Sequence, residues 1–133
     1  MHIKTTYEGQ LRTEAIHNKS GNLLLTDAPQ DNNGKGETFS PTDLVAAALT
    51  SCMITIMGIE AAKMGIELKD LTAETEKVMS ASPRKISKIR VSINWDNPTG
   101  TLEQQKELKE KAVKCPVALS LSNSLVQDIR FNF

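Results

Sequence analysis

The stretch FSPTDLVAAALTSCMITIM, residues 39–57, decides the fold. Its opening SPTD has the order of a helix start, with Ser40 as N-cap, Pro41 as the first helical residue and Asp43 able to complete a capping box. The apolar run from Leu44 to Ile59 is shorter than the roughly 20 residues that a membrane helix needs, and it contains hydroxyl side chains. The sequence therefore predicts a core helix of a soluble protein from Pro41 to about Lys63, buried on nearly every side.

The segments on both sides of this helix predict strands and two further helices. Alternation of apolar and polar residues is clearest in KISKIRVSINW, and NKSG (residues 18–21) has the composition of a hairpin turn. The expected strands are 2–7, 11–17, 22–26, 66–79, 85–95 and 124–133, and the expected later helices are 101–114 and 116–123. A long loop, 27–40, precedes the central helix. This order predicts a single α+β domain over residues 1–133 rather than a doubly wound sheet.

The composition of the chain argues against several classes of binding partner. The chain carries 16 basic and 16 acidic residues and has a formal net charge of zero, so nothing points to nucleic acid or to a charged membrane surface. Aromatic residues make up only 4% of the chain, which argues against a platform for stacking bases. The first residues, MHIKTTYEG, do not have the pattern of a signal peptide. We therefore expect a cytoplasmic protein that binds no nucleic acid and no membrane.

The chain has two cysteines, Cys52 and Cys115, which are 63 positions apart (115 − 52). In a reducing cytoplasm they are not expected to form a structural disulfide. Neither belongs to a CxxC motif, and His2 and His17 are not at ligand spacing, so no metal site is expected. Inert buried thiols and redox-active thiols both remain open.

The surroundings of the two cysteines predict different chemistry. In KCPVALSL (residues 114–121) Cys115 stands at the N-cap of a helix that begins at Pro116, where free backbone N–H groups lower a thiol pKa. The alternative is a small side chain that fills a gap between helices. Cys52 lies on an apolar helix face, where burial raises a thiol pKa and makes it inert. Only a cation from elsewhere in the fold would reverse this.

Taken together, FSPTDLVAAALTSCMITIM and KCPVALSL resemble the OsmC/Ohr superfamily of osmotically induced and organic hydroperoxide resistance proteins. The resemblance rests on a cysteine eleven residues after the helix-starting proline (Pro41 to Cys52) and on a later Cys-Pro pair that opens a helix. It extends to the order of elements along nearly the whole chain. It implies an OsmC-like fold, in which antiparallel sheets pack around a long central apolar helix, and an intertwined homodimer with active sites at the interface.

The resemblance also implies roles for individual residues. Cys52 matches the thiolate that attacks a hydroperoxide, and Cys115 matches the thiol that resolves the resulting sulfenate into a disulfide. An arginine of the N-terminal strands supports the reactive thiol in the family; Arg12 is the match, and Arg84 is a rival. A glutamate directly after the proline also supports it, but Thr42 occupies that position here. Asp43, one residue later, is either a site carboxylate or only the helix cap.

Two functions therefore remain open at this point. The first is a cofactor-free thiol peroxidase that reduces small organic hydroperoxides and is itself reduced by a thiol, which in several family members is a dihydrolipoyl group. The alternative is a non-catalytic protein on the same fold, either redox-responsive or binding a small ligand in an apolar pocket. The paired cysteines favour the enzyme, and Thr42 favours the alternative. A pKa decrease of about two units gains only about threefold in thiol reactivity, so a peroxidase also needs a cation at the departing oxygen.

Overall fold

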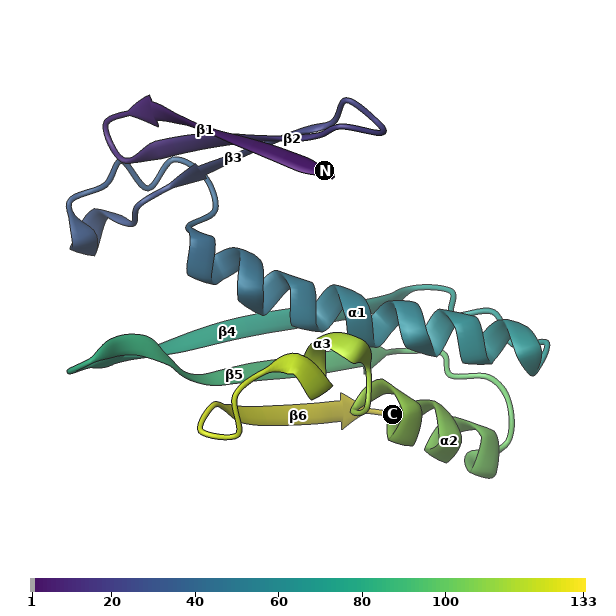
Figure 1. Ribbon diagram of the computed structural model, residues 1–133. Helices are drawn as coiled ribbons and strands as arrows, with labels where there is room; N and C mark the ends of the chain where they lie inside the picture. Colours follow the sequence, from purple (N-terminus) through teal and green to yellow (C-terminus); the bar gives the residue numbers. More distant parts are fainter. Residues whose placement is uncertain (1) are drawn as a thin grey trace. The chain divides into compact units, whose positions relative to one another are not determined.

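The computed structural model describes residues 2–133, and the chain divides into two units, with the boundary between Val45 and Ala46 (Figure 1). The first unit holds a sheet of three antiparallel strands in the order β1 (Ile3–Gly9), β2 (Arg12–His17) and β3 (Leu23–Asp27). The predicted turn at residues 18–21 joins β2 to β3, and the N–H of Gly21 donates to the carbonyl of His17 at 2.7 Å. This confirms the predicted hairpin.

The loop after β3 folds back against the end of that strand. The N–H of Asp27 donates to the carbonyl of Phe39 at 3.1 Å, and a short 3-10 helix, η1 (Gln30–Asn32), lies between them in the chain. A Cβ atom at Gly34 would stand 1.7 Å from the carbonyl oxygen of Ala28, so only glycine fits there. The loop is therefore held by backbone hydrogen bonds and by close packing.

Helix α1 (Pro41–Lys63) begins and ends as the sequence predicts. The N–H of Ser40 donates to the Asp43 carboxylate at 2.9 Å, and the N–H of Asp43 donates to the Ser40 hydroxyl at 3.1 Å. These two bonds form the expected capping box. At the other end Gly65 has a φ of 69°, and the N–H of Ile66 donates to the carbonyl of Ala61 at 2.8 Å. A left-handed glycine with this bond is a common helix stop.

The second unit holds a mixed sheet rather than the purely antiparallel one that we expected. Strands β4 (Leu71–Ala81) and β5 (Arg84–Trp95) are antiparallel, whereas β6 (Val126–Asn132) runs parallel to β5. A parallel pair needs a long crossover connection. Helices α2 (Leu102–Ala112) and α3 (Pro116–Ser120) form that connection. The expectation of antiparallel sheets is therefore wrong at this strand, although the α+β class is confirmed.

The core of the second unit lies between α1 and this sheet. The alternation read in the sequence is confirmed, because every second residue of β5 from Ile89 to Trp95 is buried. A hydrogen bond of 2.6 Å joins the hydroxyls of Thr50 in α1 and Thr75 in β4. The buried apolar side chains are Ala46, Leu49, Met53, Met57 and Ala61 of α1, Ile89, Val91, Ile93 and Trp95 of β5, Leu108 and Ala112 of α2, and Cys115 and Ala118 at the start and in the middle of α3.

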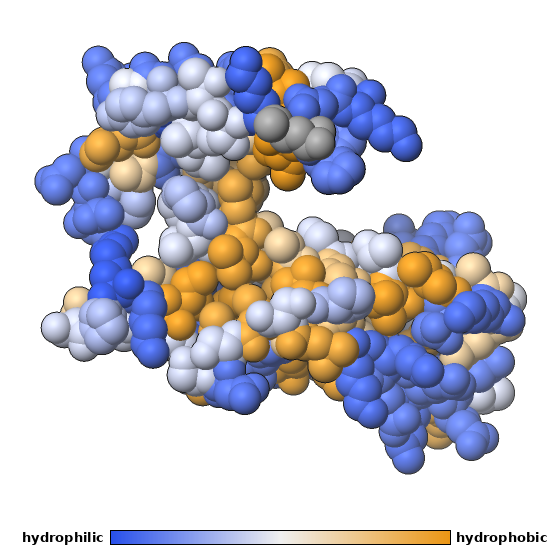
Figure 2. All heavy atoms as spheres, in the orientation of Figure 1, coloured by the Kyte–Doolittle hydropathy of each residue, from blue (hydrophilic) through white to orange (hydrophobic). Residues whose placement is uncertain are grey.

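Helix α1 is not buried on nearly every side, which corrects the prediction from its composition. Its buried residues recur three or four positions apart, as in a helix that packs through one stripe. Outside the stripe Ile59 is 48% exposed, and apolar side chains gather along α1 in the surface view (Figure 2). By length and composition α1 could also cross a membrane, a property that core helices of soluble proteins share.

Met53→Ala should lower the free energy of unfolding by about 2–5 kcal/mol, because Met53 is fully buried at the centre of the stripe. The matched control is Leu102→Ala, since Leu102 is 85% exposed at the start of α2. Denaturant unfolding of both variants measures the difference. Equal losses would contradict the assignment of the α1 stripe as the core.

Candidate redox site

Cys115 lies at the N-cap of α3, as the sequence predicts. Pro116 is the first helical residue, and the N–H of Ala118 donates to the Cys115 sulfur at 3.4 Å. The residue is fully buried. In the middle of the short helix, the Gln127 side chain of β6 donates to the carbonyl of Ala118 at 2.9 Å. Cys115 is therefore fixed in place by its own helix and by the neighbouring strand.

The structure brings the two thiols together. Cys52 lies two residues after Thr50 on α1, is partly exposed, and is close enough to Cys115 to raise the pKa of that thiol. Both cysteines are free thiols. The contact follows from the packing of α1 and α3 within the second unit, because the two residues are far apart in the sequence. A partly accessible thiol thus lies near a thiol that solvent does not reach.

The pKa of Cys115 is raised, which corrects the expectation that the helix start would lower it. Burial is the largest cause, and the adjacent Cys52 sulfur raises the pKa further. The backbone N–H groups of Ala118 and Val117 act in the opposite direction but do not compensate. A helix of five residues has a small dipole, so desolvation of the thiolate dominates. Cys115 is therefore a protonated thiol at neutral pH.

Asp43 serves as the helix cap described above. Its carboxylate accepts the N–H of Ser40, and the hydroxyls of Ser40 and Thr42 lie 3.2 Å apart. The position that holds a glutamate in the family pattern therefore presents a threonine hydroxyl, and the nearest carboxylate in the sequence is engaged in capping. This arrangement supports the capping interpretation of Asp43; a part in the redox site stays a prediction.

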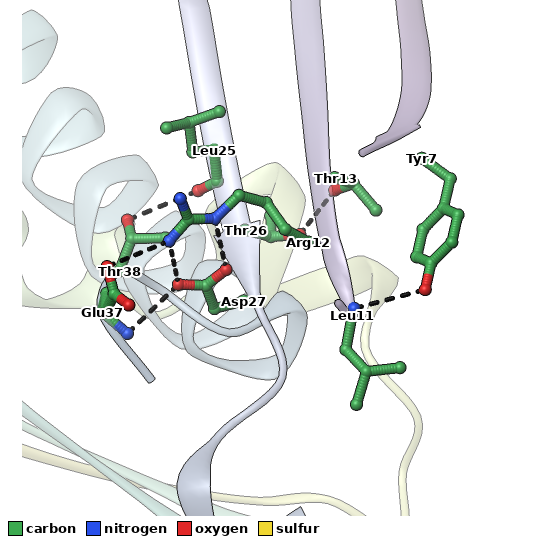
Figure 3. Close-up of polar contacts among 9 residues, drawn as sticks. All are labelled: Tyr7, Leu11, Arg12, Thr13, Leu25, Thr26, Asp27, Glu37 and Thr38. Atoms are coloured by element: carbon green, nitrogen blue, oxygen red, sulfur yellow. Dashed lines mark hydrogen bonds and ion pairs between the residues drawn. The ribbon is translucent and has the colours of Figure 1, made fainter. Parts of the chain in front are cut away.

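Arg12 has a carboxylate partner on the neighbouring strand (Figure 3). Its Nε donates to Asp27 Oδ1 and its Nη2 to Asp27 Oδ2, each at 2.7 Å, and Nη2 also lies 3.4 Å from Glu37 Oε2. Arg12 and Asp27 are directly opposite each other in the β2–β3 register. The pair lowers the pKa of Asp27, mainly through the hydrogen bond from Arg12.

Arg84, the rival cation, is remote from Cys52 in the same chain. Thr75 bonds to Thr50, two residues before Cys52. From Thr75 strand β4 continues six residues to Ala81, about 20 Å at the usual strand rise, and Arg84 pairs with Ala81. An arginine side chain is too short to cover that length. Within one chain Arg84 is therefore excluded as the activating cation.

Sequence reasoning missed the part that Asp27 and Glu37 play. Asp27 was grouped with the long polar loop, yet it ends β3 and is completely buried. A buried carboxylate needs a charged partner. Arg12 begins the adjacent strand, so the register of the β2–β3 hairpin would have predicted that Arg12 and Asp27 form a pair. Glu37 is also tied to this cluster by its backbone, because its N–H donates to Asp27 Oδ2 at 3.1 Å.

The second unit also has a cavity that lies apart from the two cysteines. A cavity of about 690 Å³ in the second unit is lined by residues of segments 64–70 and 97–104, and neither cysteine lines it. Among residues 2–133 no group of three His, Cys, Asp or Glu side chains is placed to hold a metal ion. The chemistry of the described chain is therefore concentrated in the thiol pair and in the Arg12 cluster.

One thiol on a long core helix, with a Cys-Pro helix start near it, is the arrangement of proteins with OsmC/Ohr-type folds. The family described as OsmC-like protein matches residues 34–130, and the chain belongs to this family. No curated protein sequence matches the chain.

Solved structures agree with this assignment. A protein from Psychrobacter arcticus 273-4, named as a candidate osmotic stress induced and detoxification response protein, is 45% identical, with 99% of this chain and 96% of that chain covered and a TM-score of 0.94. The organic hydroperoxide resistance protein OsmC of Legionella pneumophila is 18% identical over 98% and 95% of the two chains, with a TM-score of 0.77. OhrB of Bacillus subtilis is 15% identical over 98% and 96%, with a TM-score of 0.66. The last two show the shared fold alone.

Stability should fall in acid because of the Asp27 carboxylate. A carboxylate with a lowered folded-state pKa stabilises the fold above its unfolded pKa of about 3.9, and that stability is lost as the pH falls through the lowered value. Asp128, whose pKa Arg90 and Arg130 lower, adds to the same trend. Unfolding midpoints measured from neutral pH to below pH 3 should decrease, and Asp27→Asn should flatten the decrease. An unchanged slope in that variant would show that the Arg12–Asp27 pair does not contribute.

Proposed function

We propose that this protein is a thiol-dependent peroxidase that reduces organic hydroperoxides in the cytoplasm. The observation that carries the proposal is the proximity of a partly exposed Cys52 thiol to a buried Cys115 thiol at a helix start. Two thiols that lie close together can be oxidised to a disulfide. The names of the Legionella pneumophila and Bacillus subtilis proteins, both organic hydroperoxide resistance proteins, support the choice of substrate.

Burial assigns the two thiols to different steps. Cys52 is partly exposed, so an organic hydroperoxide can reach its sulfur, whereas Cys115 is completely buried. The helix-start argument alone would have made Cys115 the better nucleophile, but its raised pKa and its burial remove that advantage. We therefore assign the attack on the peroxide to Cys52 and the resolving step to Cys115.

The reaction balances without a cofactor. The Cys52 thiolate attacks the hydroxyl oxygen of ROOH, the O–O bond breaks, and sulfur is oxidised by two electrons to a sulfenic acid while RO⁻ takes a proton from water to give ROH and hydroxide. Cys115 then attacks the sulfenic sulfur, the S–O bond breaks, and the departing hydroxide takes the Cys115 proton to leave as water. A dithiol reductant, such as a dihydrolipoyl group, returns two electrons and two protons to the disulfide.

Arg12 is the residue that we propose to stabilise the departing oxygen. A guanidinium donates hydrogen bonds to negative oxygens and stays charged at neutral pH. The resemblance of the N-terminal strands to the family pattern supports this role. Asp43 retains a supporting role in the proposal through the cap that fixes the first turn of α1.

The experiment uses the fully reduced protein and one equivalent of cumene hydroperoxide, followed by intact mass under non-reducing conditions. We expect a loss of two protons and no added oxygen, because the sulfenic acid is converted to a disulfide. Unchanged thiols after long exposure would contradict the peroxidase. They would favour the non-catalytic alternative, a redox-responsive or ligand-binding protein, for which Thr42 in place of a carboxylate is the supporting observation.

Single cysteine variants separate the two roles. Cys52→Ser should abolish peroxide consumption, and Cys115→Ser should allow one turnover and then accumulate sulfenic or sulfinic acid at Cys52. Dimedone labelling followed by peptide mass spectrometry identifies the oxidised residue. Oxidation of Cys115 in the Cys52→Ser variant at the wild-type rate would reverse the assignment.

We also propose that the working form is a twofold homodimer. Apolar side chains outside the buried stripe of α1, such as Ile59, are exposed in the single chain, as are Leu23, Leu24 and Leu25 of β3. Exposed apolar surface of this kind usually binds a partner. Sedimentation equilibrium at low micromolar concentration should give twice the 14.6 kDa chain mass. A mass of one chain would refute the dimer.

A further inference from the structure

Strand β6 carries a polar side chain at a position that faces the core of the second unit. In the parallel pairing of β6 with β5, Gln127 lies opposite Ile89. Paired side chains point to the same face of a sheet, and Ile89 is fully buried. Further along β6, Ile129 and Phe131 lie on this same face. Gln127 is thus a glutamine in a row of β6 that is otherwise apolar.

An amide on a core face needs a hydrogen-bond partner, and helix α3 supplies it. The Gln127 side chain donates to the carbonyl of Ala118 at 2.9 Å. Carbonyls near the end of a helix lack partners within the helix, so a donor from outside satisfies one of them. The chain returns from α3 to β6 through a turn, in which the N–H of Leu125 donates to the carbonyl of Ser122 at 3.0 Å. This turn brings β6 back to the helix that precedes it.

Ala118 connects the Gln127 bond to the Cys115 thiol. Its N–H donates to the Cys115 sulfur at 3.4 Å, while its carbonyl accepts from Gln127. Ala118 is itself buried. One residue of α3 therefore binds the sulfur through its N–H and the sheet through its carbonyl.

Helix α3 needs outside support to hold the sulfur in place. It has five residues, whereas isolated helices shorter than about 12–15 residues are marginal in water. The bond from the Cys115 N–H to the carbonyl of Ala112 at 3.1 Å ties its start to the end of α2. The bond from Gln127 instead ties its middle to the sheet, on which α1, the helix of Cys52, also packs. Gln127 thus links the element that carries one thiol to the surface that supports the other.

We propose that Gln127 is a positioning residue, which holds α3 on β6 so that the Cys115 sulfur stays within reach of the Cys52 sulfur for disulfide formation. This inference rests on the proposed function. In the step concerned the S–S bond forms, the S–O bond of the Cys52 sulfenic acid breaks, and the departing hydroxide takes the Cys115 proton to leave as water. The Cys52 sulfur is reduced, the Cys115 sulfur is oxidised, and Gln127 exchanges neither protons nor electrons.

The test uses the aromatic disulfide DTNB, which separates the steps of the two thiols without a peroxide. With one equivalent of DTNB, the Cys52 thiolate forms a mixed disulfide and releases a first thionitrobenzoate. Cys115 then attacks the Cys52 sulfur, releases the second thionitrobenzoate and gives its proton to water. Stopped-flow absorbance measures both releases. In Gln127→Met we expect an unchanged first release and a second release slowed about 10- to 100-fold, because a displacement of about 1 Å can have an effect of that size.

Gln105→Met is the matched control. Gln105 is a buried glutamine of the same unit, and its side chain donates to the carbonyl of Thr99 at 3.2 Å. The substitution removes a bond of the same kind, but from the loop before α2 and not from α3. We expect both releases at wild-type rates in this variant. An equal slowing of the second release in the two glutamine variants would overturn the inference, because it shows a general loss of stability.

Gln127→Asn provides a second variant where Gln127→Met fails to fold, as judged by denaturant unfolding. Asparagine keeps the amide but is one methylene shorter, so either the bond to Ala118 is lost or α3 shifts to keep it. Both results displace the Cys115 sulfur, so we expect the same selective slowing of the second release. The ratio of the second to the first release is the deciding quantity, since a merely structural role does not change it selectively.

A wild-type ratio in folded Gln127→Met or Gln127→Asn would overturn the inference and leave the peroxidase standing. A wild-type protein that releases only one thionitrobenzoate would also overturn it, because Cys115 then does not attack the Cys52 sulfur. A wild-type protein that gives both releases but consumes no cumene hydroperoxide would contradict the proposed function instead. The DTNB comparison then decides the role of Gln127 by itself.

Discussion

The contact between the Cys52 and Cys115 thiols depends on how α1 is packed. The buried stripe through Leu49, Met53 and Met57 sets the rotation of the helix over the sheet, and the Thr50–Thr75 bond sets its position along β4. A rotation by one residue, about 100°, would turn Cys52 away from α3. The core of the second unit therefore does more than stabilise the fold, since it also determines that the two sulfurs meet.

Much of this fold could be predicted because its signals are local. The Ser40–Asp43 capping box, the glycine stop at Gly65 and the alternation along β5 each depend on residues close together in the sequence, and each is present in the structure. The parallel pairing of β6 with β5 could not be read in the same way. Strand direction depends on the path of the whole crossover, and apolar alternation is the same in either direction.

The sequence predicted which residues form the candidate site but not their electrostatic surroundings. Motifs identified both cysteines, but the pKa of Cys115 depends on what surrounds it in three dimensions. Its place at a helix start is a local feature, whereas its complete burial depends on the tertiary structure. Likewise Arg12 was a candidate by its position in the sequence, and its partner Asp27 emerged only from the strand register. Electrostatic properties of a site are set by neighbours that sequence spacing does not reveal.

A buried, protonated resolving thiol imposes an order on the proposed chemistry. Because the Cys115 pKa is raised by burial and solvent does not reach the sulfur, Cys115 does not react directly with a peroxide. In the proposed reaction it attacks only the neighbouring Cys52 sulfur. Once that sulfur is a sulfenic acid, the hydroxide that leaves is a base at the right place to accept the Cys115 proton. In the proposed reaction, burial therefore slows a direct attack of Cys115 on the peroxide. It slows disulfide formation little, because the hydroxide released from the Cys52 sulfenic acid accepts the Cys115 proton.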